Sequence, residues 1–203
     1  MKRVTEIKKQ TDNRFLNMYE LTSVHRDGST SPYFMASRIS DPEELKLCQE
    51  EKPADAVMIV ALKDGKMVLE KQYRYPLDDY IYEFPAGLCE KGEDLLETAK
   101  REFFEETGMT FEPITGHNSS RPYYTSIGLS DEAISTVYGY ASGEATTEHQ
   151  EETEDINVVF ADKEECRRIL QDEHVTIMCA LILMHYINAE EDPFEKFLVY
   201  EKD

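Results

Sequence analysis

Apolar residues alternate with polar ones or form short continuous runs along much of the chain, which predicts several β-strands. The continuous apolar run Ala56–Leu62 is typical of an interior strand that is covered on both faces. The polar segment Lys63–Lys66 contains Asp-Gly and predicts a hairpin turn into a second strand at Met67–Tyr73. Further short strands are expected at residues 80–84, 110–116, 133–141 and 155–160.

Three other segments read as helices. The first is expected to begin near Glu93 and to end at Gly108, since Gly adopts the left-handed conformation of a helix end at little cost. The second runs over Asp162–Leu170, with Asp162 as its N-cap. The third, His174–Ala189, is apolar enough to predict a buried helix.

The first part of the chain has a pattern of its own. Two β segments, Phe15–Leu21 and Tyr33–Ala36, flank Asp27-Gly28 and predict a hairpin. The charged residues 41–53 are expected to link this hairpin to the rest. For a chain of 203 residues we therefore expect a small N-terminal antiparallel β appendage, residues 1–50, and one main domain, residues 51–203.

Several carboxylates fall on one side of the helix predicted at residues 93–108. At about 100° per residue, three glutamates lie within an arc of about 100°, namely Glu102, Glu105 and Glu106. A stripe of apolar residues occupies the neighbouring arc and is expected to be buried, namely Leu96, Ala99 and Phe103. Arg101 can hold Glu97 and Glu105, four residues away on either side, by ion pairs. Oxygen ligands of this kind suit Mg²⁺ or Mn²⁺.

The alternative interpretation is a solvated, salt-bridged helix, since a chain with 42 Asp and Glu residues contains glutamate clusters by chance. The complete pattern favours function, because it fixes glycine, arginine, glutamate and apolar positions together over Gly87–Met109. That segment matches the Nudix box at every defined position, and the chain therefore resembles a Nudix hydrolase. The resemblance implies an α/β/α sandwich with a mixed sheet, and hydrolysis of a nucleoside diphosphate linked to another group.

The resemblance also implies a set of site residues. The metal ligands would be the carbonyl of Ala86 and the side chains of Glu93, Glu102, Glu105 and Glu106. They would bind Mg²⁺, with Mn²⁺ as a substitute. Glu105 and Glu106 would thereby act in catalysis, and Arg101 would orient the carboxylates of the box. The proton acceptor for the attacking water would come from a later acidic loop, as either Glu152 or Glu154.

The segment Glu83–Gly87 is similar to the ADP-ribose pyrophosphatase branch of the family, in which an arginine at the position of Arg74 contacts substrate. The alternative for Arg74 is a surface ion pair with Asp78 or Asp79. Glu83 is expected either to contact substrate or to pair with a basic neighbour. Ile127 stands where that branch usually has proline, so another nucleoside diphosphate sugar such as GDP-mannose remains an alternative substrate to ADP-ribose. A non-catalytic nucleotide sensor is the alternative from another class of function.

The net charge of −20 argues against binding to a nucleic-acid backbone, and it requires cations to offset repulsion of a diphosphate. No apolar run is long enough for a membrane span. The four cysteines are dispersed along the chain, which favours free thiols and a protein in the reducing cytoplasm. In similar enzymes the N-terminal sheet joins a homodimer and helps bind the adenine. Aromatic residues of the appendage are candidates for stacking on the base, namely Tyr19, Tyr33 and Phe34.

Overall fold

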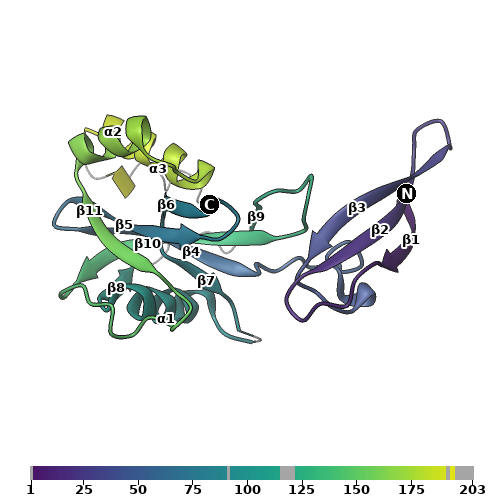
Figure 1. Ribbon diagram of the computed structural model, residues 1–203, viewed down its shortest axis with the longest axis horizontal. Helices are drawn as coiled ribbons and strands as arrows, with labels where there is room; N and C mark the ends of the chain where they lie inside the picture. Colours follow the sequence, from purple (N-terminus) through teal and green to yellow (C-terminus); the bar gives the residue numbers. More distant parts are fainter. Residues whose placement is uncertain (1, 91, 115–121, 191–192, 195–203) are drawn as a thin grey trace, which may run out of the picture. The chain divides into compact units, whose positions relative to one another are not determined.

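The computed structural model describes residues 2–90, 92–114, 122–190 and 193–194. The chain divides into two compact units (Figure 1). The first comprises the described residues of Met1–Asp55 and Arg121–Ile134, and the second those of Ala56–Ser120 and Ser135–Asp203. Each unit has its own core, and each is described by itself below.

The larger unit is built on a sheet with the strand order β11-β5-β4-β10-β8. Two short strands extend it, since β6 pairs with β5 and β7 pairs with β4. The bounds are β4 Ala56–Lys63, β5 Lys66–Arg74, β6 Asp79–Glu83, β7 Ala86–Leu88, β8 Thr110–Pro113, β10 Ala133–Ser142 and β11 Ile156–Ala161. The predicted strands are confirmed to within a few residues, and β7 is a strand that the sequence did not predict.

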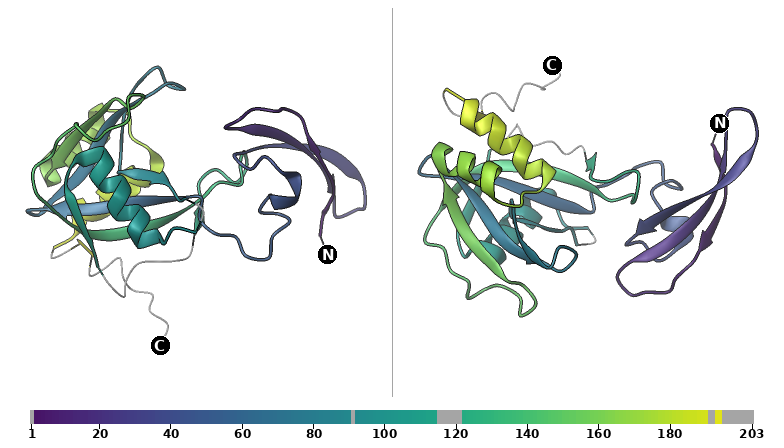
Figure 2. Two further views of the ribbon diagram at one scale, coloured as in Figure 1. Left: turned by 90° about the horizontal axis from the view of Figure 1, so that it is seen from below. Right: turned by 45° about the horizontal axis from the view of Figure 1, so that its top comes forward.

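In the described part of the larger unit, three helices cover the two faces of this sheet. Figure 1 shows α1 (Leu95–Thr107) on one side and both α2 (Lys163–Asp172) and α3 (Ile177–Asn188) on the other, and Figure 2 shows the same arrangement from two further directions. The predicted α/β sandwich is therefore confirmed. Asp162 caps α2 as expected, because its carboxylate accepts from the backbone N–H groups of Glu164 and Glu165.

Helix α1 packs on the sheet through the stripe that the sequence predicted. Ala99 and Phe103 are buried together with Val57, Ile59 and Ala61, which are alternate residues of β4 and so share one face of the strand. The helix begins after the N-cap Asp94, whose side chain accepts from Leu96 N at 2.9 Å. It ends at Gly108, which has the expected left-handed conformation with φ of 74°.

Helix α3 is less buried than predicted. Its inner face contributes buried residues such as Cys179 and Leu183, but an apolar stripe faces outward, formed by Ile177, Leu181 and Met184, which are 72%, 58% and 50% exposed. The helix is apolar on nearly all sides, and a helix that packs on one face of a sheet buries only one of them.

The smaller unit contains a three-stranded antiparallel sheet in the order β1-β2-β3. The bounds are β1 Val4–Lys9, β2 Asn17–Val24 and β3 Thr30–Ser37. The predicted hairpin is confirmed as β2 and β3. The sequence did not predict β1, whose residues are mostly polar, nor the packing of residues 122–134 in this unit. Pro42–Glu44 form a single 3₁₀ turn, and β9 (Tyr123–Tyr124) pairs with Ala133 and Ile134 at the start of β10.

Candidate active site

The box residues lie where strand β7 meets helix α1. Pro85 O accepts a hydrogen bond from Ile59 N at 2.8 Å, and β7 pairs antiparallel with β4 so that Gly87 lies opposite Val57. These bonds hold the turn before the helix against the central strand of the sheet. Helix α1 packs on the same strands, so the turn and the helical glutamates are brought together.

Gly87 is required because the carboxylate of Glu102 occupies the space beside it. A Cβ added at Gly87 would lie 1.8 Å from Cδ of Glu102, far inside van der Waals contact. Any side chain at position 87 would therefore displace Glu102 from this corner.

We expect Gly87→Ala to lower Mn²⁺ affinity by about 10- to 100-fold while leaving the thermal unfolding midpoint close to that of the wild type. The reason is that Glu102 can rotate away, whereas the backbone of β7 stays paired. Gly128→Ala is the matched control, because an added Cβ there meets nothing within 4 Å. Isothermal titration with Mn²⁺ measures the affinities, and equal values for both variants would contradict the role given to Gly87.

Arg101 gathers three carboxylates. Its guanidinium donates to both oxygens of Glu93 at 3.0 and 2.9 Å, to Oε1 of Glu102 at 2.9 Å and to Oε2 of Glu105 at 3.0 Å. The hydrogen bonds from Arg101 lower the pKa of Glu93 to about 2. The predicted pair between Arg101 and Glu97 is wrong, because Glu97 pairs instead with Lys100 at 2.7 Å. Arg101 thus pairs with carboxylates of the box and not with Glu97.

Glu106 is the most buried of the box glutamates. It is 4% exposed, and its Oε2 accepts from Ala86 N at 3.0 Å, which links the end of α1 to the turn before β7. Burial raises the pKa of Glu106 well above its usual value, and the charges of Glu70, Glu102 and Glu154 add to that effect. A cation at this position would offset the crowded negative charge.

The residues present fit a divalent cation, although their side chains are arranged for ion pairing. Within the described parts of the chain, no three acidic, histidine or cysteine side chains already converge as ligands of one ion. Arg101 engages three of the carboxylates instead. Two observations favour a cation: Gly87 leaves room only for the carboxylate of Glu102, and Oε1 of the buried Glu70 has no hydrogen-bond partner in the described structure. All the donors are oxygens, which suits Mg²⁺ or Mn²⁺.

Arg74 and Glu83 form an ion pair beside the acidic cluster. Nε of Arg74 lies 2.6 Å from Oε1 of Glu83, from the adjacent strands β5 and β6. The alternative partner Asp78 instead accepts from the hydroxyl of Tyr73 at 2.5 Å. Arg74 remains half exposed, so part of its guanidinium faces solvent and can contact an anionic ligand.

The loop before β11 places the two candidate proton acceptors differently. Glu154 is partly buried and accepts from Glu151 N at 3.0 Å, and its charge contributes to raising the pKa of Glu102 and of Glu106 after the larger effect of burial. Glu152 is exposed, and no comparable effect connects it to these carboxylates. Of the two, Glu154 is therefore the one whose charge acts on the box carboxylates Glu102 and Glu106.

The NUDIX domain family matches residues 52–178 of the chain, which is more than half of it. The chain belongs to the Nudix family. It is 37% identical over 128 residues to the ADP-ribose pyrophosphatase of Bacillus subtilis (strain 168), over 63% of this chain and 58% of that protein. It is 31% identical over 142 residues to the methanol dehydrogenase activator of Bacillus methanolicus, over 68% and 74% of the two chains. The chain thus spans little more than half the length of the Bacillus subtilis relative.

The fold is also similar to that of a crystal structure of ADP compounds hydrolase. The TM-score is 0.68 at 19% sequence identity, and the alignment covers 89% of this chain and 90% of the other. This likeness supports the Nudix fold alone. In the described part of the chain, no helix combines the length and the apolar character that a bilayer-spanning segment needs.

Helix α1, which carries the box glutamates, makes contacts with the acidic loop before β11 that the sequence did not predict. Gln150 Nε2 donates to Glu106 O at 2.8 Å and to Ile156 O at 3.3 Å, and the ring of His149 stacks on Phe104 with centroids 4.5 Å apart. These contacts fix the loop that carries Glu154 against α1. The sequence around His149 and Gln150 gives no indication of these contacts, since Gln150 and Glu106 are 44 residues apart in the chain.

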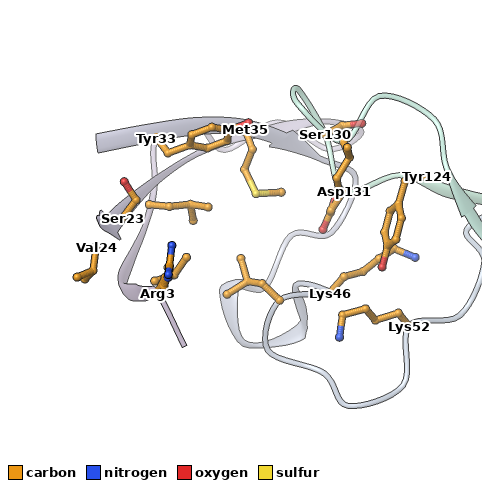
Figure 3. A pocket seen from close by; sticks show the side chains of 14 residues that line it. Arg3, Ser23, Val24, Tyr33, Met35, Lys46, Lys52, Tyr124, Ser130 and Asp131 are labelled. Atoms are coloured by element: carbon orange, nitrogen blue, oxygen red, sulfur yellow. The ribbon is translucent and has the colours of Figure 1, made fainter. Parts of the chain in front are cut away.

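The aromatic candidates of the smaller unit have different surroundings. Tyr19 is fully buried and its hydroxyl donates to Ile39 O and Ser40 O, so the idea that it stacks on a base is wrong. Tyr33 is 43% exposed, donates to Gly128 O at 2.7 Å and lines a cavity of about 430 Å³ (Figure 3). Phe34 is exposed on the opposite face of the sheet, paired with Glu20. Tyr33 and Phe34 therefore remain candidates.

Proposed function

We propose that this protein is a Mg²⁺-dependent Nudix pyrophosphohydrolase that cleaves the diphosphate of a nucleoside diphosphate sugar. The best candidate reaction converts ADP-ribose and water to AMP and ribose 5-phosphate. The observation that carries the proposal is the complete box: every glutamate of the metal face is present, on one helix, beside a glycine that leaves room only for Glu102.

The residues that would hold Mg²⁺ are the carbonyl of Ala86 and the carboxylates of Glu102, Glu105 and Glu106, with Glu93 less directly because Arg101 holds both of its oxygens. When bound, Mg²⁺ supplies positive charge to the two phosphates and lowers the pKa of coordinated water. Mn²⁺ is expected to substitute, since both ions prefer oxygen ligands. Arg101 keeps the carboxylates oriented and does not contact substrate.

The protein's own groups would divide the remaining tasks. Glu154 is proposed to take the proton from the attacking water. The water oxygen forms a bond to one phosphorus while the bond from that phosphorus to the bridging oxygen breaks, and the other phosphate leaves with that oxygen. Arg74 would donate to phosphate oxygens from its exposed edge, while Glu83 holds the guanidinium in place. Tyr33 would contact the base.

We prefer ADP-ribose to GDP-mannose as the candidate substrate, because similar proteins are described as hydrolases of ADP-ribose or ADP-sugars. Proteins similar to this chain are named ADP-ribose pyrophosphatase in Bacillus subtilis and ADP-sugar pyrophosphatase in Mus musculus, the latter 42% identical over 72 residues. Ile127 is 64% exposed, so its replacement of the usual proline does not disturb a packed core.

A homodimer formed through the N-terminal sheet is part of the proposal. Large apolar side chains of the smaller unit are exposed, including Phe15 and Phe34 at 67% and 53%. Exposed apolar side chains favour association with another protein surface where they adjoin one another. Light scattering after size exclusion tests this part, and a monomer would remove it. A cytoplasmic location remains a prediction.

The catalytic proposal is tested by a panel of ADP-ribose, GDP-mannose, NADH and diadenosine polyphosphates, each with Mg²⁺ and with Mn²⁺. We expect AMP from ADP-ribose, at a rate that chelation with EDTA abolishes. Faster turnover of GDP-mannose would keep the enzyme and change the substrate. Tight binding across the panel without product would instead identify a sensor.

A further inference from the structure

A buried glutamate outside the Nudix box, Glu70, lies close to Glu106 of the box. Glu70 is in the middle of β5 and is only 1% exposed. Val68, two residues earlier on the same face of the strand, packs with Ala99 and Phe103 of α1. The side chain of Glu70 therefore points towards the layer that α1 occupies.

The partners of Glu70 do not satisfy a buried carboxylate. Oε1 has no hydrogen-bond partner in the described structure, and the carboxyl group interacts with that of Glu106. Glu83 and Glu154 add negative charge nearby. The cation that acts on it is Arg74, which already forms the ion pair with Glu83.

Such an arrangement is unfavourable for the protein alone. An ionised carboxylate removed from water needs hydrogen bonds or an opposite charge, and two adjacent carboxyl groups cannot both ionise at low cost. An apolar residue could occupy this strand position at less cost, and Oε1 of Glu70 is left without a hydrogen-bond partner among the described residues.

We propose that Glu70 supplies a further oxygen ligand to a divalent cation that Glu106 also holds. The site then draws its carboxylates from the central strand as well as from the box helix. This inference rests on the proposed function, because it assumes that the box binds a cation. Mg²⁺ keeps several waters and takes few protein carboxylates, so one added ligand changes its site substantially.

The test is Mn²⁺ binding to Glu70→Gln in the absence of substrate, by isothermal titration and by the loss of free-ion signal in electron paramagnetic resonance. We expect affinity at least about tenfold weaker than in the wild type. Gln has the size of Glu and can still hydrogen-bond to Glu106. If Glu70 serves only as a hydrogen-bond partner, the affinity stays unchanged, and that result would overturn the proposal.

Glu97→Gln is the matched control, because Glu97 is exposed on α1 and pairs with Lys100. It should bind Mn²⁺ as the wild type does. If the wild type and Glu97→Gln bind Mn²⁺ and release AMP while Glu70→Gln binds equally well, only the role of Glu70 fails. If the wild type itself binds no Mn²⁺, the proposed function fails with it.

Thermal unfolding gives a second readout that needs no activity. Without metal, Glu70→Gln should unfold at or above the wild-type midpoint, because a carboxyl group without a full set of partners has been removed. The rise in midpoint on adding Mn²⁺ should be smaller than in the wild type, since weaker binding stabilises less. Glu70→Leu provides the same comparison should the Gln variant fold poorly, and an equal Mn²⁺-induced rise in the folded variant would overturn the proposal.

Discussion

Glu106→Gln is expected to lower kcat/KM for ADP-ribose by at least about 100-fold. Mutating a residue that only hydrogen-bonds to a metal ligand already lowers metal affinity or activity by about 10- to 100-fold, and Glu106 is proposed as a ligand itself. Glu106 is nearly inaccessible and sits among Glu70, Glu102 and Glu154, so its charge acts in a poorly solvated place. Gln retains an oxygen that can accept from Ala86 N, which preserves the turn before β7. The change therefore removes charge and leaves the local hydrogen bond.

The measurement is steady-state AMP release over a range of Mg²⁺ concentrations, together with Mn²⁺ affinity. We expect the variant to require more metal and still to turn over slowly at saturation. Glu97→Gln, the exposed control on the same helix, should behave as the wild type. Turnover of Glu106→Gln at the wild-type rate would show that the assignment of metal ligands is wrong.

Glu154→Gln is expected to lower kcat by about 10²- to 10⁴-fold, the usual contribution of a positioned general base. The loop that carries it is held to α1 by Gln150 and by the stacking of His149 on Phe104, so the substitution should not move the loop. Metal affinity should change little. The rate of the variant should recover in part at high pH, because hydroxide from solvent replaces the missing proton acceptor.

Glu152→Gln is the matched control, since it lies in the same loop, has the same chemistry and is exposed. It should retain wild-type kcat and a wild-type pH profile. The reverse pattern, with a large loss at Glu152 and none at Glu154, would exchange the two roles. Wild-type rates for both variants would place the proton acceptor outside this loop.

Helix α1 is the element near the candidate site that the sequence predicted well. Its glutamates and its apolar stripe repeat within a few turns, so local periodicity determines which residues share a face. Leu96, Ala99 and Phe103 accordingly pack on the sheet, and Gly108 ends the helix. The ion pairs of Arg101 were less predictable. The predicted pair with Glu105 forms, the predicted pair with Glu97 does not, and the pair with Glu93 was not predicted.

The position of Glu70 shows why the rest needed the structure. Its sequence neighbours indicate only a strand. Its approach to Glu106 joins residues that have strands β6 and β7 and most of helix α1 between them in the chain. The choice between Glu152 and Glu154 likewise depends on how the loop is held to α1. The outward apolar stripe of α3 depends on how much of the helix the sheet can cover.

The sequence by itself determined the family, the α/β class and the chemistry of the box, because these depend on residue types at fixed spacings along one helix and its preceding turn. Only the tertiary structure decided which carboxylate from β5 approaches that helix, which residues hold the loop before β11 against it, and which aromatic side chains of the smaller unit are buried. Those outcomes depend on contacts between segments far apart in the chain, and the pairing and packing that create such contacts leave no local pattern.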